Sequence, residues 1–309
     1  MARAAAAEAV AGADGRNQYT AIQGLPALLG AIVRFYDRVF SWKIQESNVC
    51  VTTSGTQAIY SACQALIDPG DEVVVFEPFF PWYLPAIRLA GGVPKVVTLA
   101  PEDSFQLARG PLERAVGEKT KLVICNTPHN PTSHVYSDEE LRLLADVVLA
   151  HPDVILISDE AYEGQAWALP HRKIAAMEGM FERTLTLSTA SKLCSLTGWR
   201  VGWAVGPPAL VDGLKLIVSM SAGRRAGMGG GLTRNKVRLR NILRAHATAG
   251  GDRGGPRRGD GRVRRHPGAL QGQRRGTLRC LRGPEPAALP RGGRLLPRRG
   301  RPRLGQGGL

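Results

Sequence analysis

The chain has 309 residues, of which 43% are hydrophobic, and a formal net charge of +15. The charge is unevenly divided: residues 1–218 carry 18 basic and 23 acidic side chains (net −5), and residues 219–309 carry 23 and 3 (net +20), which together give +15. The net charge of the whole chain therefore does not indicate a nucleic-acid-binding protein, and no apolar run is long enough to span a membrane.

Strand-like and helix-like segments alternate along residues 1–218. Met1–Val10 is alanine-rich and favours a helix over a signal peptide. Short apolar runs rich in β-branched residues predict strands at Asp71–Phe76, Lys121–Cys125, Val154–Ile157, Thr184–Leu187 and Val201–Val205. Helices are predicted at Thr56–Leu66, Ser137–Leu149 and Ala209–Val218, the second opening with a capping box of Ser137 and Glu140. This order predicts an α/β fold with a largely parallel, doubly wound sheet and helices on both faces.

Polar residues follow three of the predicted strands. They are Asn126–Asn130, Asp159–Tyr162 and Lys192. In a parallel sheet, ligands bind beyond the carboxyl ends of the strands, so we expect a site there. The turn Thr52–Gln57 precedes a helix and either cradles a phosphate with its backbone N–H groups or is simply a helix N-cap.

The segment Ser188–Gly202 places Lys192 in a turn rich in hydroxyls and Arg200 eight residues later. A primary amine can hold pyridoxal phosphate (PLP) as a Schiff base, and hydroxyls with a guanidinium can bind its phosphate. The alternative interpretation is a surface turn before a buried strand.

Together these segments resemble the fold-type I PLP-dependent aminotransferases of class I/II, in the branch of kynurenine aminotransferases, glutamine transaminases and cysteine-S-conjugate β-lyases. The motifs that carry the resemblance are Asn17–Thr20, Gly70–Val73, Glu77–Phe80, Asn126–Thr132, Asp159–Tyr162 and the lysine segment. The resemblance implies the large domain of that fold over residues 1–218.

The resemblance also implies roles for individual residues. Lys192 would bind the PLP aldehyde and then move the proton at the substrate Cα. Asp159 would face the pyridine nitrogen, Asn130 and Tyr162 would hydrogen-bond the phenolic oxygen, and Phe80 would stack on the ring. Otherwise Asp159 is a helix N-cap and Phe80 a core residue.

The residues implied for phosphate binding are Gly55, Thr56, Gln57, Thr189 and Arg200. Thr189 stands where the family more often has serine or glycine. Tyr19 matches a tyrosine that reaches the phosphate of the neighbouring subunit, which implies a homodimer. Alternatively, Tyr19 is a buried residue that holds the amino-terminal arm in place.

Two family features are absent from the sequence: a segment ahead of Asn17–Thr20, and a recognisable arginine for the substrate carboxylate. Residues 219–309 are rich in Gly, Arg and Pro, and we expect them to be disordered, with the small carboxyl-terminal domain missing or scrambled. We hypothesise that this region is read in the wrong frame. The same one-base shift in codons for His246–Asp252 and Gly293–Pro297 restores two family-like motifs, and a retained intron at Gly223–Asn241 is the alternative.

The sequence thus predicts a PLP-dependent aminotransferase acting on an L-amino acid and a 2-oxo acid, with β-elimination of sulfur conjugates as a side activity. The alternatives are a PLP-binding but inactive homologue, and an Arg/Gly-rich nucleic-acid-binding tail on a metabolic domain. Five scattered cysteines favour a reducing compartment and predict no metal site. We expect a cytoplasmic protein, with mitochondria as the alternative.

Overall fold

A computed structural model describes residues 2–12, 19–167 and 169–222. Its centre is a seven-stranded sheet of order β1-β7-β6-β5-β4-β2-β3. β7 runs antiparallel to β6 and β1, and the other neighbouring pairs are parallel. The strands are β1 (Val49–Thr52), β2 (Glu72–Glu77), β3 (Val93–Thr98), β4 (Thr120–Asn126), β5 (Ile155–Asp159), β6 (Thr184–Thr189) and β7 (Gly202–Val205). The predicted largely parallel sheet is confirmed.

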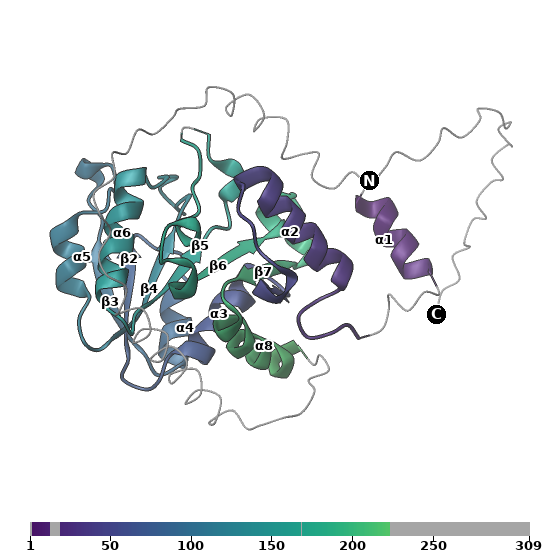
Figure 1. Ribbon diagram of the computed structural model, residues 1–309, viewed down its shortest axis with the longest axis horizontal. Helices are drawn as coiled ribbons and strands as arrows, with labels where there is room; N and C mark the ends of the chain where they lie inside the picture. The colour runs from purple at the N-terminus through teal and green to yellow at the C-terminus, as the bar shows by residue number, and fades with distance from the viewer. Residues whose placement is uncertain (1, 13–18, 168, 223–309) are drawn as a thin grey trace, which may run out of the picture.

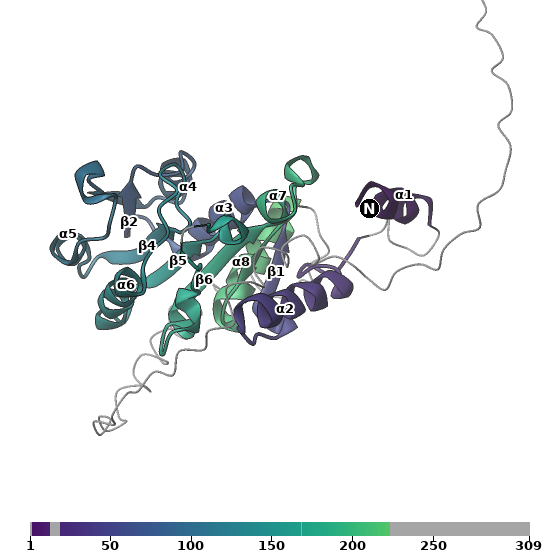
Figure 2. The same cartoon turned by 90° about the horizontal axis from the view of Figure 1, so that it is seen from above.

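Helices cover both faces of the sheet, as predicted. The α-helices of the described residues are α1 (Ala2–Ala11), α2 (Pro26–Phe40), α3 (Gly55–Leu66), α4 (Tyr83–Leu89), α5 (Arg109–Ala115), α6 (Asp138–Ala150), α7 (Ala190–Leu193) and α8 (Pro208–Ala222). α3, α4 and α8 pack on one face, whereas α2, α5 and α6 pack on the other (Figures 1 and 2). The sheet is therefore the middle of three layers.

Residues of one strand alternate between the two faces. In β2, Val73 and Val75 lie in the apolar cluster under α3 and α4, whereas Val74 and Phe76 lie in the cluster under α5 and α6. Because a strand buried on both faces needs apolar side chains at every position, the central strands read as continuous apolar runs. This is why the sequence located them.

Several elements were not predicted, and the edge strand β3 shows why. Val93 and Val96 are 47% and 46% exposed, and Pro94 and Lys95 stand between them. Proline and lysine are typical of edge strands, where they block pairing with another chain, but they interrupt the apolar run that identifies a strand. The short β1 and the helices α2, α4 and α5 were also missed. α2 did carry a signal, with Pro26 at its first turn and buried residues at Leu29, Ile32, Phe35 and Tyr36.

The capping box that opens α6 is confirmed: the Glu140 N–H donates to Ser137 Oγ at 3.2 Å, and the Ser137 N–H donates to Glu140 Oε2 at 2.8 Å. α8 continues to Ala222, across the predicted domain boundary at residue 218. The predicted disorder and frame error of the tail concern residues that, from 223 on, lie outside the described part of the chain. The division into two domains stays a prediction.

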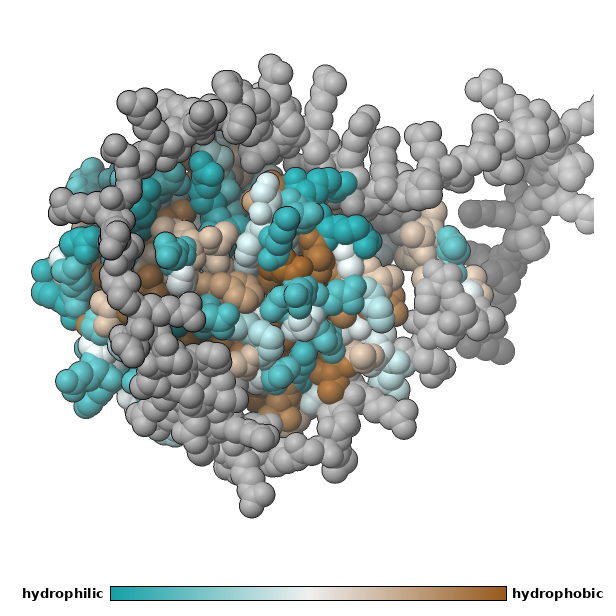
Figure 3. Space-filling view, viewed as in Figure 1, coloured by the Kyte–Doolittle hydropathy of each residue, from teal (hydrophilic) through white to brown (hydrophobic). Residues whose placement is uncertain are grey.

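Within the described residues, no helix combines the length and apolarity that crossing a bilayer requires. Figure 3 shows hydrophilic residues spread between apolar ones over the face that it presents. The side chains of Cys50, Cys63 and Cys125 are buried, and that of Cys194 is partly exposed.

Candidate functional site

The carboxyl ends of β4, β5 and β6 bring the predicted polar residues to one edge of the sheet. Asn126 at the end of β4 pairs in register with Asp159 at the end of β5, and Asp159 pairs with Leu187 of β6. β6 leads directly into the short helix α7, which carries Lys192. The motifs far apart in sequence therefore meet because the strands that precede them are neighbours.

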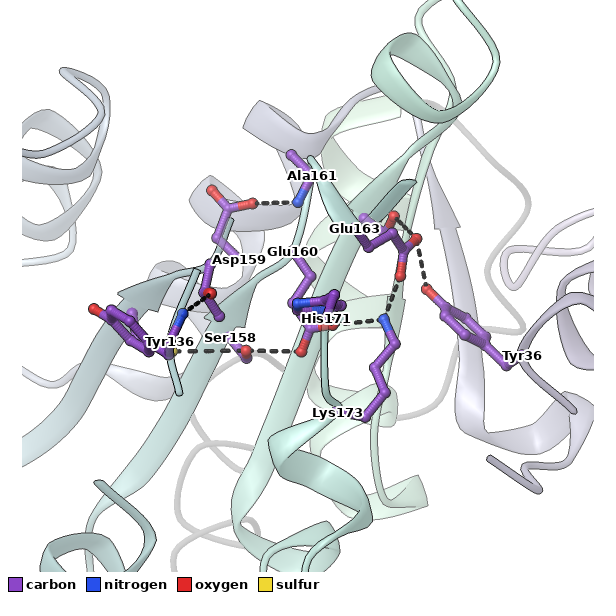
Figure 4. A network of polar contacts seen from close by, with 12 residues as sticks. Tyr36, Tyr136, Ser158, Asp159, Glu160, Ala161, Glu163, His171 and Lys173 are labelled. Atoms are coloured by element: carbon purple, nitrogen blue, oxygen red, sulfur yellow. Dashed lines mark hydrogen bonds and ion pairs between the residues drawn. The ribbon is translucent and has the colours of Figure 1, made fainter. Parts of the chain in front are cut away.

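Asp159 is 7% exposed, and both of its carboxylate oxygens are held by the protein. Tyr83 donates its hydroxyl to Oδ2 at 2.6 Å, and the Ala161 N–H donates to Oδ1 at 3.2 Å (the latter drawn in Figure 4). Asn126 Nδ2 donates to the Asp159 carbonyl at 2.8 Å. Burial raises the pKa of the Asp159 carboxyl to about 6, although the hydrogen bonds from Tyr83 and Ala161 work in the opposite direction.

Asn130 and Tyr162 are joined by a hydrogen bond of 3.3 Å from Asn130 Nδ2 to the Tyr162 hydroxyl. The Asn130 N–H donates to Asn126 Oδ1 at 2.7 Å, which fixes the loop after β4. Lys192 Nζ lies 5.9 Å from the centre of the Tyr162 ring. Partial burial and, to a lesser extent, Asp159 raise the pKa of the Tyr162 phenol, so it is a neutral hydroxyl at physiological pH. The structure thus brings an amine, a phenol and an amide together beside a buried carboxylate.

The turn before α3 is shaped as a backbone cradle. Ser54 is the N-cap and accepts the Gln57 N–H at 3.1 Å, and Gln57 Oε1 accepts the Thr53 N–H at 2.7 Å. The N–H groups of Gly55 and Thr56 head the helix, where no carbonyl within the helix can reach them. Backbone N–H groups at the positive end of a helix dipole are a favourable place for an anion.

Strand β7 passes so close to this cradle that only glycine fits. A Cβ at Gly202 would lie 2.5 Å from the Ser54 carbonyl carbon and 2.7 Å from the Gly55 nitrogen. Thr189, the register partner of Gly202 on β6, is also close, with its Cβ 3.8 Å from where a Cβ of Gly55 would be. The Thr189 hydroxyl donates to the Val201 carbonyl at 2.8 Å and accepts the Ser191 N–H at 3.1 Å.

The remaining predicted residues are placed as follows. Phe80 is partly buried, with its ring edge-on to Tyr83 at 5.8 Å between ring centres. Arg200 is exposed, has a left-handed backbone (φ 54°), and donates to the Thr197 carbonyl at 3.4 Å. Tyr19 is 78% exposed, so the alternative of a buried tyrosine does not hold within this chain.

Comparison with known proteins identifies the family of the chain. The family described as "Aminotransferase class I and II" matches residues 1–227. The chain belongs to this family. It is 37% identical over 219 residues to kynurenine–oxoglutarate transaminase 3 of Rattus norvegicus, covering 67% of this chain and 48% of that protein. It is 38% identical over 217 residues to kynurenine–oxoglutarate transaminase of Dictyostelium discoideum, covering 65% and 50%.

Solved structures of aminotransferases share the fold. N-succinyldiaminopimelate aminotransferase from Mycobacterium tuberculosis superimposes with a TM-score of 0.69 at 34% identity, covering 80% of this chain and 64% of that one. A tetra mutant of Thermus thermophilus aspartate aminotransferase gives 0.68 at 31% identity, covering 80% and 66%. The chain spans about half the length of the curated relatives that it matches.

Two features of this aminotransferase-family site were not foreseen from the sequence. One is Tyr83, the partner of Asp159, whose only sequence signal is that it follows the Glu77–Phe80 motif. The other is a buried ionic network of Glu160, Glu163, His171 and Lys173 directly behind the site (Figure 4). Tyr83 lies 76 positions from Asp159, and the four network residues, although within 13 positions of one another, show no helix or strand periodicity.

The network anchors the turn that carries Asp159 and Tyr162. Lys173 Nζ donates to Glu160 Oε2 at 2.5 Å and also bonds to Glu163 Oε2, and His171 Nε2 lies 2.6 Å from Glu160 Oε2. Glu163 further accepts hydrogen bonds from Ser188 of β6 and, at 3.4 Å, from the Tyr36 hydroxyl of α2. Both glutamates that flank the turn are therefore fixed to other elements.

Proposed function

We propose that this chain contains the cofactor-binding large domain of a PLP-dependent aminotransferase, which transfers an amino group between an L-amino acid and a 2-oxo acid. The observation that carries the proposal is the constellation around Asp159: a buried carboxylate beside the Asn130–Tyr162 pair, with the Lys192 amine 5.9 Å from the Tyr162 ring. The family to which the chain belongs supports the reaction type.

The described residues fit PLP at each of its polar groups. The open N–H groups at the head of α3, crossed at close range by Gly202, suit a phosphate. The buried Asp159 suits a ring nitrogen that carries a proton, because a carboxylate stabilises a neighbouring cation. The Tyr162 hydroxyl, already paired with Asn130, suits a phenolate oxygen. Arg200 and Thr189 complete the phosphate-binding set in this proposal.

When bound, the cofactor supplies an electron sink for the charge that develops at the substrate Cα. Lys192 would hold the cofactor aldehyde through Nζ, and its amine, once free, would be the group that moves the proton at the substrate Cα. Asp159 would hold a negative charge near the ring nitrogen, and Tyr162 and Asn130 would donate hydrogen bonds to the phenolic oxygen. Phe80 would pack against the ring and exclude water from that side.

Substrates and assembly are further parts of the proposal. Relatives named for kynurenine–oxoglutarate and aspartate/prephenate transamination indicate amino acids with either aromatic or acidic side chains as donors. The exposed Tyr19 is proposed to reach the phosphate of a second subunit in a homodimer. The scattered positions of the five cysteines favour a reducing compartment, which we take to be the cytoplasm.

The proposal is tested by reconstituting the full chain with PLP. We expect a visible absorbance band that borohydride reduces, and a Lys192→Ala variant without it. Adding an amino acid should bleach this band as the amino group is transferred. Absence of PLP uptake would contradict the proposal, whereas uptake without any response to amino acids would support the alternative of an inactive cofactor-binding protein.

A further inference from the structure

We propose that Tyr83 is a positioning residue for Asp159. The Tyr83 hydroxyl holds the Asp159 carboxylate in the orientation and the charge state needed to face a protonated ring nitrogen. This inference rests on the proposed function, because that function assigns Asp159 to the cofactor ring. Tyr83 and Asp159 are 76 residues apart in sequence and 2.6 Å apart at Oη and Oδ2.

The tyrosine is held rigidly. Tyr83 is the first residue of α4, is 2% exposed, and lies in the apolar cluster between α3, α4 and the sheet. Its ring packs edge-on against Phe80, the residue proposed to cover the cofactor. Since apolar side chains enclose the ring, the hydroxyl cannot turn to solvent, and it donates its hydrogen bond to the Asp159 carboxylate.

The carboxylate is fixed at both oxygens and yet keeps room for a ligand. Tyr83 occupies one position on Oδ2, and the Ala161 N–H occupies one on Oδ1. An ionised carboxylate offers about four acceptor positions, so both oxygens can each accept one more hydrogen bond. Rotation of the carboxylate would break both existing bonds, and the remaining lone pairs therefore keep a fixed direction.

The Tyr83 hydroxyl also favours the ionised form of Asp159. Burial favours the neutral acid, whereas a hydrogen bond donated to the carboxylate favours the anion, and Tyr83 is the strongest of the groups that lower the pKa of Asp159. Burial and the nearby Asp159 raise the pKa of Tyr83 well above its ordinary value, so the phenol stays a neutral donor. Without this donor, more of Asp159 would be protonated near neutral pH, and a protonated carboxyl would not stabilise a positive ring nitrogen.

The test uses the full chain without cofactor. The chain is labelled with aspartate carrying ¹³C at the side-chain carboxyl, its titration is followed by NMR, and the Asp159 signal is assigned by its loss in Asp159→Asn. Tyr83→Phe keeps the ring and removes the hydroxyl, and we expect the pKa of Asp159 to rise by about one unit. The matched control is Tyr136→Phe: Tyr136 is also 2% exposed, and its hydroxyl has no hydrogen-bond partner among the described residues. The control should leave the Asp159 titration unchanged, and an unchanged titration in Tyr83→Phe would overturn the proposal.

A second variant keeps the proposal testable if Tyr83→Phe does not fold. Introducing 3-fluorotyrosine at position 83 keeps the size of the side chain and makes the phenol a stronger donor, so the pKa of Asp159 should fall; no change would again contradict the proposal. With PLP bound, the pH dependence of its absorbance should shift in Tyr83→Phe and not in Tyr136→Phe. If none of these proteins takes up PLP, the proposed function fails, while the cofactor-free titration still decides whether Tyr83 controls Asp159.

Discussion

Asp159 and Glu160 are adjacent in sequence and both buried, yet their carboxyl pKa values are displaced in opposite directions. Burial raises the pKa of Asp159 to about 6, because its partners are neutral hydroxyl and N–H groups. Burial by itself would also raise the pKa of Glu160. Lys173 and His171 have the larger effect and lower the pKa of Glu160 to about 2. One turn therefore carries a carboxylate that has no positive partner among its hydrogen-bonding groups, Asp159, beside one that is paired with the Lys173 ammonium, Glu160.

Asp159 should reduce the stability of the cofactor-free protein at neutral pH. Its folded pKa of about 6 lies above the ordinary value of 3.8, so its contribution is most favourable below about pH 3.8 and is lost as the pH rises to about 6. We expect Asp159→Asn to raise the free energy of unfolding by about 2–3 kcal/mol at pH 7.5, with the gain shrinking toward pH 4.5. Urea unfolding at both pH values measures this. A cofactor-free variant less stable than the parent at pH 7.5 would contradict it.

Lys173 should be essential for stability, because it compensates two buried carboxylates at once. Lys173→Met leaves Glu160 and Glu163 without their shared cation, and we expect a loss of about 3–5 kcal/mol in urea unfolding at pH 7.5. Lys95→Met is the control, since the Lys95–Glu72 pair at 3.5 Å is partly exposed and should contribute less than about 1 kcal/mol. Equal effects of the two substitutions would show that the buried network is not the cause.

Gly202→Ala should damage the proposed phosphate cradle. The new methyl group would lie 2.5 Å from backbone carbon of Ser54, so either β7 or the turn before α3 has to move. We expect a cost of about 1–3 kcal/mol in stability and a comparable or larger loss in PLP affinity, measured by absorbance titration. Gly117→Ala, where a Cβ meets nothing within 4 Å, should bind PLP as the parent does. Unchanged affinity in Gly202→Ala would remove the cradle from the proposed site.

The capping box of α6 should make a measurable contribution of its own. Ser137→Ala removes the hydroxyl that accepts the Glu140 N–H, and we expect a loss of about 1 kcal/mol in the free energy of unfolding. Ser47→Ala, at an exposed position of a short helical turn, should change stability by less than about 0.5 kcal/mol. A loss in both variants would indicate a general effect of removing serine.

Much of the fold could be predicted from the sequence, because the central strands are buried on both faces. Apart from Lys121 at its start, the run Lys121–Cys125 is apolar, and Val154–Ile157 is apolar throughout. The helices between such runs carry their own start signals, as Ser137 does for α6. The two edge strands of the sheet were not predicted: β3 is half exposed, and β1 has only four residues. The antiparallel direction of β7 was also missed, since an apolar run predicts a strand but not the direction in which it pairs.

The sequence by itself determined which chemical groups are present and, through the order of the strands, that Asn130, Asp159 and Lys192 would collect at one edge of the sheet. Only the tertiary structure decided what surrounds them. The Tyr83 hydroxyl on Asp159, the Lys173 network behind it and the approach of Gly202 to Ser54 each join segments separated by 10 to about 150 residues. Such contacts depend on how helices and loops pack over the finished sheet, where burial and charge act between side chains that have no fixed spacing along the chain.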